Sequence, residues 1–452
     1  MKKFFTNFRL LAVAILLSAS LSVHAQSSSD TVFKPHGTLW GYAFGDFAYK
    51  GNADTAGFAK NAKYRGGSNQ YTNVNWANNG QNMNLFQLRR AYLGYNYDIS
   101  PKFSAEFLLA AEDDFNSAAP TTYTATSTST TTITGAPGAA ATTKTTTTVS
   151  VSNPASNQNG DLLADGKLAP YLKLANVRWK QIYPGADLVI GEVATPSFPL
   201  LSEVVWNYRS IERTVSDIRR TPSFDLGVTL QGRFIPKNDN YGYNVMVGNG
   251  QSAKIEANAF KWFYGDVYAK FFNKHLIVDL YQDYYRLNWT PTYHHDRNMT
   301  KIFIAWTEPK FTVGVEAFTN TLMGDVAATG AADGKTYYFN TVATAVSLYA
   351  RGKIYKDKLG FFARYDTYDP TKNLSAFDNP AQFSKYSAST SQYDPTNKEN
   401  FMTLGLDYTP IKNVHIMPNI WYDSYSSSNG FSPLPNGNDM VYRLTFYFIF
   451  GK

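Results

Sequence analysis

The sequence contains no cysteine among its 452 residues. This absence excludes a fold that is stapled by disulfides, as many small secreted domains are. It also removes thiolate metal sites and cysteine nucleophiles from the available chemistry. A strong excess of charge is lacking as well, because the formal net charge is only +7. A bias this mild does not indicate a nucleic-acid partner.

Long apolar runs are missing beyond the N-terminus, since no later segment has the ~20 uninterrupted apolar residues that a membrane helix needs. Residues 1–25 have the layout of a processing segment, in which basic residues precede the apolar stretch Leu10–Leu21. That stretch is too short to span a bilayer as a helix, and an uncleaved anchor is the alternative. We expect residues 1–25 to be a signal peptide that is removed on export, and residues 26–37 to be a periplasmic N-terminal segment.

Catalytic signatures are scarce in this chain. The adjacent pair His294-His295 falls in a predicted loop, where it is more simply polar surface than a metal site. His415 shares a predicted strand face with Asp423, but no serine can be placed as a partner. We find no closed metal-ligand spacing, no nucleophile elbow and no glycine-rich phosphate loop. The sequence therefore predicts no enzyme activity, no catalytic residue, no metal and no cofactor.

What the chain does have is a repeated alternation of apolar and polar residues with a period of two. In Asp439–Phe450, Tyr442 and Leu444 share one face, and Arg443 and Thr445 share the other. Successive side chains of a strand point to opposite faces, so the pattern predicts a strand with one apolar face. Sixteen such segments are predicted, at residues 38–49, 84–97, 102–112, 170–181, 186–193, 224–235, 241–248, 259–271, 275–287, 299–307, 310–319, 342–354, 359–368, 400–409, 412–423 and 439–450.

The connections between these segments alternate between short and long. Tight turns rich in Pro, Gly, Asn, Asp and Lys are predicted at 98–101, 183–185, 236–240, 272–274, 309, 355–358 and 410–411. Long connections are predicted at 50–83, 113–169, 194–223, 249–258, 288–298, 320–341, 369–399 and 424–438. A soluble β-sandwich has no reason to sort its loops in this way, whereas a transmembrane barrel has short periplasmic turns and longer external loops. We therefore predict an all-β fold, a transmembrane antiparallel β-barrel of about 16 strands over residues 38–452.

One long connection has a biased composition. Residues 117–157 are mostly Thr, Ser and Ala, with almost no charge. They offer too few apolar side chains to bury, so we predict that residues 113–169 form a flexible, low-complexity external loop. An inert, variable loop is the simpler interpretation, and surface exposure or glycan attachment is the functional alternative.

The connection at residues 194–223 combines apolar side chains with arginines. It is too apolar to extend into water, and the surface available to it in a wide barrel is the inner wall. If it folds inward, it forms a constriction and carries the candidate substrate-binding residues Arg209, Arg213, Arg219 and Arg220. A guanidinium suits this place because it binds phosphate or carboxylate through two hydrogen bonds and stays charged. Alternatively, Arg209, Arg213, Glu212 and Asp217 pair with one another or with the wall as a structural network, and the two roles can coexist.

The inward face of the predicted strands carries both signs of charge. Its basic members are Arg90, Arg178, Lys180, Arg233, Lys270, Lys301, Arg351, Lys353, Arg364 and Arg443. Its acidic members are Glu106, Glu112, Asp225, Asp266, Asp279, Asp283, Glu316, Asp366, Asp407 and Asp423. These two sets balance, so any selectivity depends on how the charges are segregated in space.

Several stretches carry a family resemblance. They are Phe86–Tyr95 with Asp98–Ser104, then Pro196–Leu200 with Arg209–Arg213 and Asp225–Val228, and lastly Gly41–Lys50. In that order they are similar to the early hairpin, the constriction segment with its following strand, and the Bacteroidetes-type first strand of porins related to the phosphate-selective porins O and P. The resemblance implies a sixteen-stranded outer-membrane channel, often a trimer, that has its third loop folded inside and prefers anions. Of that family's binding residues, only Arg209 and Arg213 sit in a matching motif.

We interpret the sequence as a porin of the bacterial outer membrane through which small hydrophilic solutes diffuse, with a moderate preference for anions such as phosphate. Its expected partners are outer-membrane lipid and lipopolysaccharide, anionic or neutral solutes, and further copies of itself in a homotrimer. One alternative is a channel for sugars or other neutral solutes. It is indicated by aromatic side chains predicted to point inward, namely Trp262, Tyr264, Tyr268, Tyr285, Tyr349, Tyr368 and Trp421. The other alternative is a surface adhesin or enzyme that uses the barrel as an anchor.

Overall fold

A computed structural model of the chain describes residues 33–53, 81–82, 84–112, 122–130, 144–152, 170–218, 221–252, 256, 258–290, 293–372, 382–388, 397–427 and 437–451. The chain divides into two units, Met1–Pro35 and His36–Lys452, and the second contains all the described strands and helices. The expected signal peptide at residues 1–25 and most of the expected segment at 26–37 lie outside the described residues.

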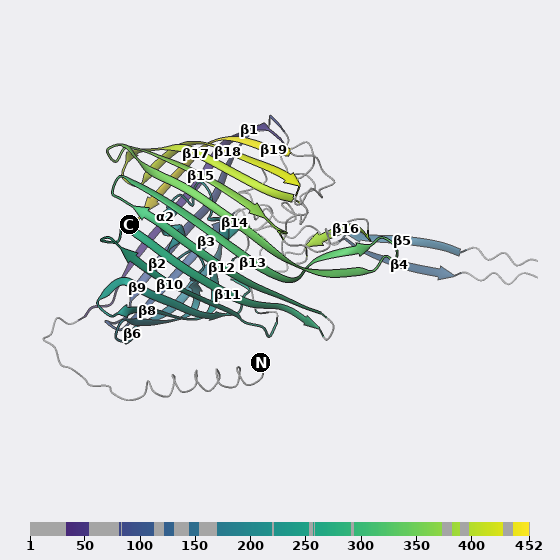
Figure 1. The fold of residues 1–452 in the computed structure, drawn as a ribbon, viewed down its shortest axis with the longest axis horizontal. Helices are drawn as coiled ribbons and strands as arrows, with labels where there is room; N and C mark the ends of the chain where they lie inside the picture. The colour runs from purple at the N-terminus through teal and green to yellow at the C-terminus, as the bar shows by residue number, and fades with distance from the viewer. Residues whose placement is uncertain are drawn as a thin grey trace, which may run out of the picture. The chain divides into compact units, whose positions relative to one another are not determined.

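Sixteen strands close into one antiparallel barrel, which confirms the predicted fold class (Figure 1). Each strand pairs with its neighbours around the ring, and the last strand returns to the first. That closing pair runs from Gly41 opposite Phe450 to Asn52 opposite Met440. Closure matters because backbone N–H and C=O groups facing lipid find no water, so a spanning sheet must pair its own edges.

The barrel strands lie where the alternation predicts them, and each of the sixteen predicted segments corresponds to a strand. Their bounds are β1 (His36–Asn52), β2 (Asn84–Asp98), β3 (Phe103–Glu112), β6 (Pro170–Tyr183), β7 (Ala186–Ala194), β8 (Phe224–Ile235), β9 (Asn238–Gly248), β10 (Trp262–Phe271), β11 (Leu276–Thr290), β12 (Tyr293–Thr307), β13 (Phe311–Gly330), β14 (Thr336–Tyr355), β15 (Leu359–Asp369), β17 (Asn397–Ile411), β18 (Val414–Ser427) and β19 (Gly437–Phe450).

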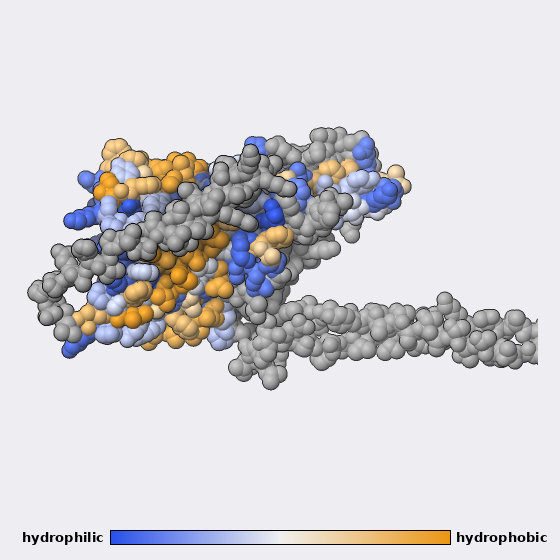
Figure 2. Space-filling view, turned by 90° about the horizontal axis from the view of Figure 1, so that it is seen from below, coloured by the Kyte–Doolittle hydropathy of each residue, from blue (hydrophilic) through white to orange (hydrophobic). Residues whose placement is uncertain are grey.

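The barrel has its apolar side chains outside and its polar side chains inside. In β8, Leu226 and Val228 are 45% and 43% exposed, whereas Asp225 and Thr229 are fully buried. This is the reverse of a water-soluble protein, in which charged residues are almost never fully buried unless they are paired. Figure 2 shows hydrophobic side chains gathered over the barrel wall and hydrophilic ones toward its two ends. The pattern suits a cylinder with lipid outside and water inside.

The connections follow the predicted alternation at one end of the barrel and depart from it at the other. All the predicted tight turns join strands that are two to four residues apart, and we call this end the turn side. Two of the predicted long connections, 288–298 and 320–341, are wrong, because strands continue through them. β11 and β12 come within two residues of each other, and β13 and β14 extend to a pairing of Thr329 with Thr336.

The reason for the longer strands lies in residue type. The extension of β14 contains Tyr337, Tyr338 and Phe339, and aromatic residues favour extended backbone. A short strand, β16 (Phe383–Ala388), pairs with the same end of β13. A spanning strand needs only about 9–11 residues, so this hairpin of two 20-residue strands continues past the membrane.

The threonine-rich connection predicted as a flexible loop also contains strands. β4 (Thr122–Thr130) and β5 (Lys144–Ser152) pair as a separate two-stranded sheet. Threonine is β-branched and favours extended backbone, which the composition argument did not take into account. The rest of residues 113–169 lies outside the described residues.

Helices are few and short among the described residues. They are α2 (Ser202–Trp206) and α3 (Val215–Ile218), and both belong to the connection between β7 and β8. Within the described parts of the chain, no helix combines the length and the apolar character needed to cross a membrane.

The apolar exterior leads to a stability prediction. Leu404 lies at the centre of β17 and is 46% exposed, and Ile411 ends the same strand on the turn side with 66% exposed. We expect Leu404→Arg to lower the free energy of unfolding by about 2–4 kcal/mol, and Ile411→Arg by about 1 kcal/mol or less, because the cost of a charge falls from the bilayer centre to its surface. Urea titration in lipid vesicles measures both values. Equal effects at the two positions would contradict a lipid-facing wall.

Candidate functional site: a constricted bore

The connection between β7 and β8 crosses the interior of the barrel. We call residues 195–223 the inward loop. Its polar contacts reach β2, β13, β14, β15, β17 and β19, most of which lie on the far side of the ring from β7 and β8. A segment that contacts strands so far apart in the ring must pass through the bore. The loop therefore occupies the space that a sixteen-stranded wall would leave open.

Arginines of the wall hold the inward loop by its backbone. Arg351 Nε donates to the carbonyl oxygen of Val205 at 2.9 Å, and Arg443 Nη2 donates to that of Ile211 at 3.0 Å. Arg89 and Arg364 donate in the same way to the carbonyl oxygens of Ser210 and Arg213. Charged donors form the stronger kind of hydrogen bond, worth roughly 1.5–3 kcal/mol each. Four such contacts make the wall arginines structural anchors of the loop.

Apolar packing fixes the loop as well. Trp206 is only 1% exposed and lies against Tyr349, with 5.0 Å between the ring centroids. Its indole N–H donates to the carbonyl oxygen of Glu212 at 2.8 Å, so the ring is buried without an unpaired polar atom. Phe198 and Ile211 of the loop are completely buried. This apolar content explains why the segment packs against the wall.

The predicted arginines of the inward loop pair with acids of the same loop. Arg209 forms ion pairs with Glu203 and Asp217, and its side chain is 15% exposed. Arg213 lies 3.8 Å from Asp217 and is 7% exposed. The network interpretation is therefore present in the structure, and it leaves Arg209 as the more accessible of the two. Arg219 and Arg220 lie outside the described residues.

The candidate wall residues separate into two groups. Arg90 is 1% exposed and lies 3.4 Å from Glu112, so its charge is buried and compensated. Lys301, Arg364 and Arg443 are likewise buried. The other candidates line two pockets on the turn side, between the inward loop and the wall. Arg178, Lys180 and Arg233 line the first pocket, and Arg351 and Lys353 line the second.

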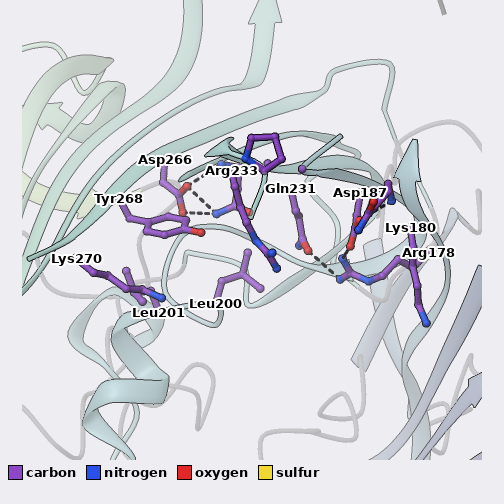
Figure 3. A pocket seen from close by; sticks show the side chains of 15 residues that line it. Arg178, Lys180, Asp187, Leu200, Leu201, Gln231, Arg233, Asp266, Tyr268 and Lys270 are labelled. Atoms are coloured by element: carbon purple, nitrogen blue, oxygen red, sulfur yellow. Dashed lines mark hydrogen bonds and ion pairs between the residues drawn. The ribbon is translucent and has the colours of Figure 1, made fainter. Parts of the chain in front are cut away.

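Both turn-side pockets have more basic than acidic side chains in their lining. The first has a volume of about 390 Å³, and its lining contains four Arg or Lys and two Asp side chains (Figure 3). The second has a volume of about 650 Å³, and its lining contains six Arg or Lys and three acidic side chains. Lys353 and Asp357 pair there, and the hydrogen bond from Lys353 lowers the pKa of Asp357, so this turn carboxylate stays ionised. The lining of each pocket therefore holds more cations than acids, although Lys180 and Lys270 of the first pocket pair with Asp98 and Asp239 outside that lining.

The alternation of apolar and polar residues did not predict that the cations Arg89 and Lys173 face inward, because each sits at a β-bulge. The register of β1 with β2 shifts at Arg89, and the register of β3 with β6 shifts at Lys173. A bulge adds one residue to a strand and turns its side chain to the other face. Arg89 therefore lies inside, with Nε 2.6 Å from Asp46, and Lys173 pairs with Glu112. One signal of the first bulge was present in the sequence. Arg89 and Arg90 are adjacent charged residues within a strand, and they break its alternation of apolar and polar residues.

The inward-facing aromatic residues that suggested a sugar channel are mostly covered. Trp262 stacks on Tyr264 and on Tyr285 with centroid distances of 5.2 and 4.5 Å, and all three are at most 4% exposed. Tyr349, Tyr368 and Trp421 are also buried, and only Tyr268 of the predicted set is partly exposed.

No metal-binding cluster is found in the part of the chain that the structure describes, because no group of three or more His, Cys, Asp or Glu residues there is arranged to hold a metal ion.

Comparisons with known proteins support the fold. No protein-family model matches the sequence, and no curated protein matches it in sequence. Among solved structures, the outer membrane channel DcaP of Acinetobacter baumannii superposes with a TM-score of 0.56 at 10% identity, over 94% of this chain and 100% of that one. The anion-selective porin from Comamonas acidovorans aligns at 11% identity over 92% of this chain and all of that one, with a TM-score of 0.49. At these identities, the likeness to DcaP establishes the barrel fold.

The anchoring of the inward loop gives a prediction that does not depend on function. In the double variant R351Q/R443Q, the carbonyl groups of Val205 and Ile211 lose their charged donors. We expect amide hydrogen exchange across α2 and α3 to become faster by roughly 100-fold or more, since two such contacts are lost and each 1.4 kcal/mol of lost protection is a factor of ten.

Mass spectrometry of the deuterated peptides measures this change. R178Q is the matched control, because Arg178 is also a wall arginine but bonds to Asp187 and Gln231. If amide hydrogen exchange in the inward loop is as slow in the double variant as in the unmodified protein, Arg351 and Arg443 do not anchor the loop.

Proposed function

We propose that the chain forms an outer-membrane channel through which small hydrophilic solutes diffuse passively, with a moderate preference for anions such as phosphate. The observation that carries this proposal is the closed sixteen-stranded wall, apolar outside and charged inside, with the inward loop across its bore. A barrel of this size encloses more space than its own side chains fill, which is the general condition for an aqueous pore. The likeness to the DcaP channel supports the same proposal at the level of the fold.

The anion preference follows from where the unbalanced charge lies. Many inward charges compensate one another in buried pairs, such as Arg89 with Asp46 and Arg364 with Asp366. The clearest excess of cations lines the second turn-side pocket, where six Arg or Lys side chains face three acidic ones. A one-signed cluster at a narrow place outweighs a balanced total, because low-dielectric walls focus its potential on the passing ion. The resemblance to phosphate-selective porins is consistent with this arrangement and remains part of the proposal.

The alternative of a sugar channel is less well supported. Aromatic rails hold sugars by their exposed faces, and the stacked set around Trp262 is buried. A homotrimer and contacts with lipopolysaccharide stay predictions from the family resemblance. The adhesin or enzyme alternative is favoured by no observation on the described residues.

A first prediction concerns the second turn-side pocket. Lys356 and Lys412 both line it. We expect K356Q/K412Q to shift the reversal potential in a salt gradient toward that of a neutral pore, because two cations leave the pore mouth. The measurement is made on refolded protein in planar bilayers at low ionic strength.

A matched control exists at the end of the barrel opposite the turn side. Lys335 and Lys372 are exposed there, outside both pockets. K335Q/K372Q removes the same charge from the protein and should leave the reversal potential closer to its original value. If the two double variants behave alike, pocket charge does not set the preference.

A second prediction concerns the arginines of the inward loop. Replacing Arg209, Arg213, Arg219 and Arg220 with glutamine should also weaken the anion preference. Because Arg209 and Arg213 are paired with acids, part of their potential is already cancelled. An unchanged reversal potential in this quadruple variant would remove the loop arginines from the proposed selectivity.

A further inference from the structure

One cation of the first turn-side pocket differs from its neighbours. Arg178 pairs with Asp187, Lys180 with Asp98, and Lys270 with Asp239. Arg233, by contrast, has no acidic side chain within ion-pair distance among the residues that the structure describes. It is exposed, and Figure 3 shows its guanidinium reaching into the middle of the pocket. A guanidinium left without a carboxylate in a cavity offers its two parallel N–H donors to a ligand.

The surface beside Arg233 is not uniformly polar. Leu200 and Leu201 of the inward loop line the same pocket and are partly exposed. Tyr268 contributes a partly exposed ring next to Arg233. Inorganic phosphate needs only hydrogen-bond donors, and it gains nothing from two leucines. A ligand with a charged head and an aliphatic body would use both parts of this lining.

We propose that this pocket is a binding subsite for a small organic carboxylate with a short aliphatic chain. The carboxylate pairs with Arg233, and the chain lies on Leu200 and Leu201. The volume of about 390 Å³ is within the range of small-ligand sites, which begins near 300 Å³. A single unpaired cation matches the single charge of a carboxylate. This proposal rests on the proposed channel and names a class of solute that would pause in it.

The test compares probes that separate charge from chain length. Binding of pentanoate, acetate, 1-pentanol and inorganic phosphate to the full chain in detergent is measured by saturation-transfer NMR. We expect pentanoate to bind about tenfold more tightly than acetate, because its additional CH₂ groups are partly buried. Pentanol, which lacks the charge, and phosphate, which lacks the chain, should both bind more weakly than pentanoate. Equal affinities for pentanoate and acetate would overturn the proposal.

Variants of the pocket separate the contribution of Arg233 to pentanoate binding from that of the leucine side chains. R233Q should weaken pentanoate binding about tenfold, and R233K should weaken it less, since it keeps the charge but loses the planar fork. L200S should reduce the affinity for pentanoate toward that for acetate. K412Q is the matched control, because it removes one cation from the second pocket and should leave pentanoate binding unchanged. If K412Q loses as much affinity for pentanoate as R233Q does, the general positive potential of the pore binds pentanoate, and the proposal of a local site at Arg233 is overturned.

Ion currents distinguish this subsite from the channel itself. If the chain forms an anion-preferring pore and pentanoate still binds no better than acetate, the subsite fails and the channel stands. If pentanoate binds as expected and no current is observed, the subsite stands and the channel fails. With both present, pentanoate should block the current at lower concentration than acetate. L200S should reduce that difference, and R233Q should raise the blocking concentration of both probes.

Discussion

The pairing of the first strand with the last is the contact on which the rest of this structure depends. Without the ladder between β1 and β19, both edges would present unpaired backbone groups to a medium that cannot solvate them. With it, each strand has one face toward lipid and one toward the bore. The same constraint explains why apolar side chains such as Leu226 are exposed while charged ones such as Asp225 are buried.

A closed wall of this size creates a second problem, which is a bore full of charged side chains. The structure answers it with the inward loop, whose apolar residues cover part of the wall and whose carbonyl groups accept hydrogen bonds from wall arginines. Much of the positive charge inside the barrel is therefore used to hold the protein together. Partly exposed cations such as Arg178 and Arg351 line the turn-side pockets. Counting inward charges from the sequence cannot make this distinction, because a paired arginine and an accessible one look the same there.

The sequence predicted the wall well and the site only in part. A strand with lipid on one side and water on the other must alternate, so β8 and β17 were recognisable from period alone. Arg89 and Lys173 escaped because a bulge reverses the alternation at a single residue, which depends on strand pairing. The extension of β14 was missed because Tyr337, Tyr338 and Phe339 are consecutive, so apolar and polar residues do not alternate there. The partners of Arg209 depend on how the loop folds, which local sequence does not determine.

The central claim is that the charged interior is an open, water-filled path across the membrane. Single-channel recording on refolded protein in a planar bilayer tests this most directly. The account predicts discrete current steps whose size scales with the conductivity of the salt solution, as expected for a wet pore. Protein that is inserted and folded as a barrel, yet gives no steps at any voltage below membrane breakdown, would contradict it.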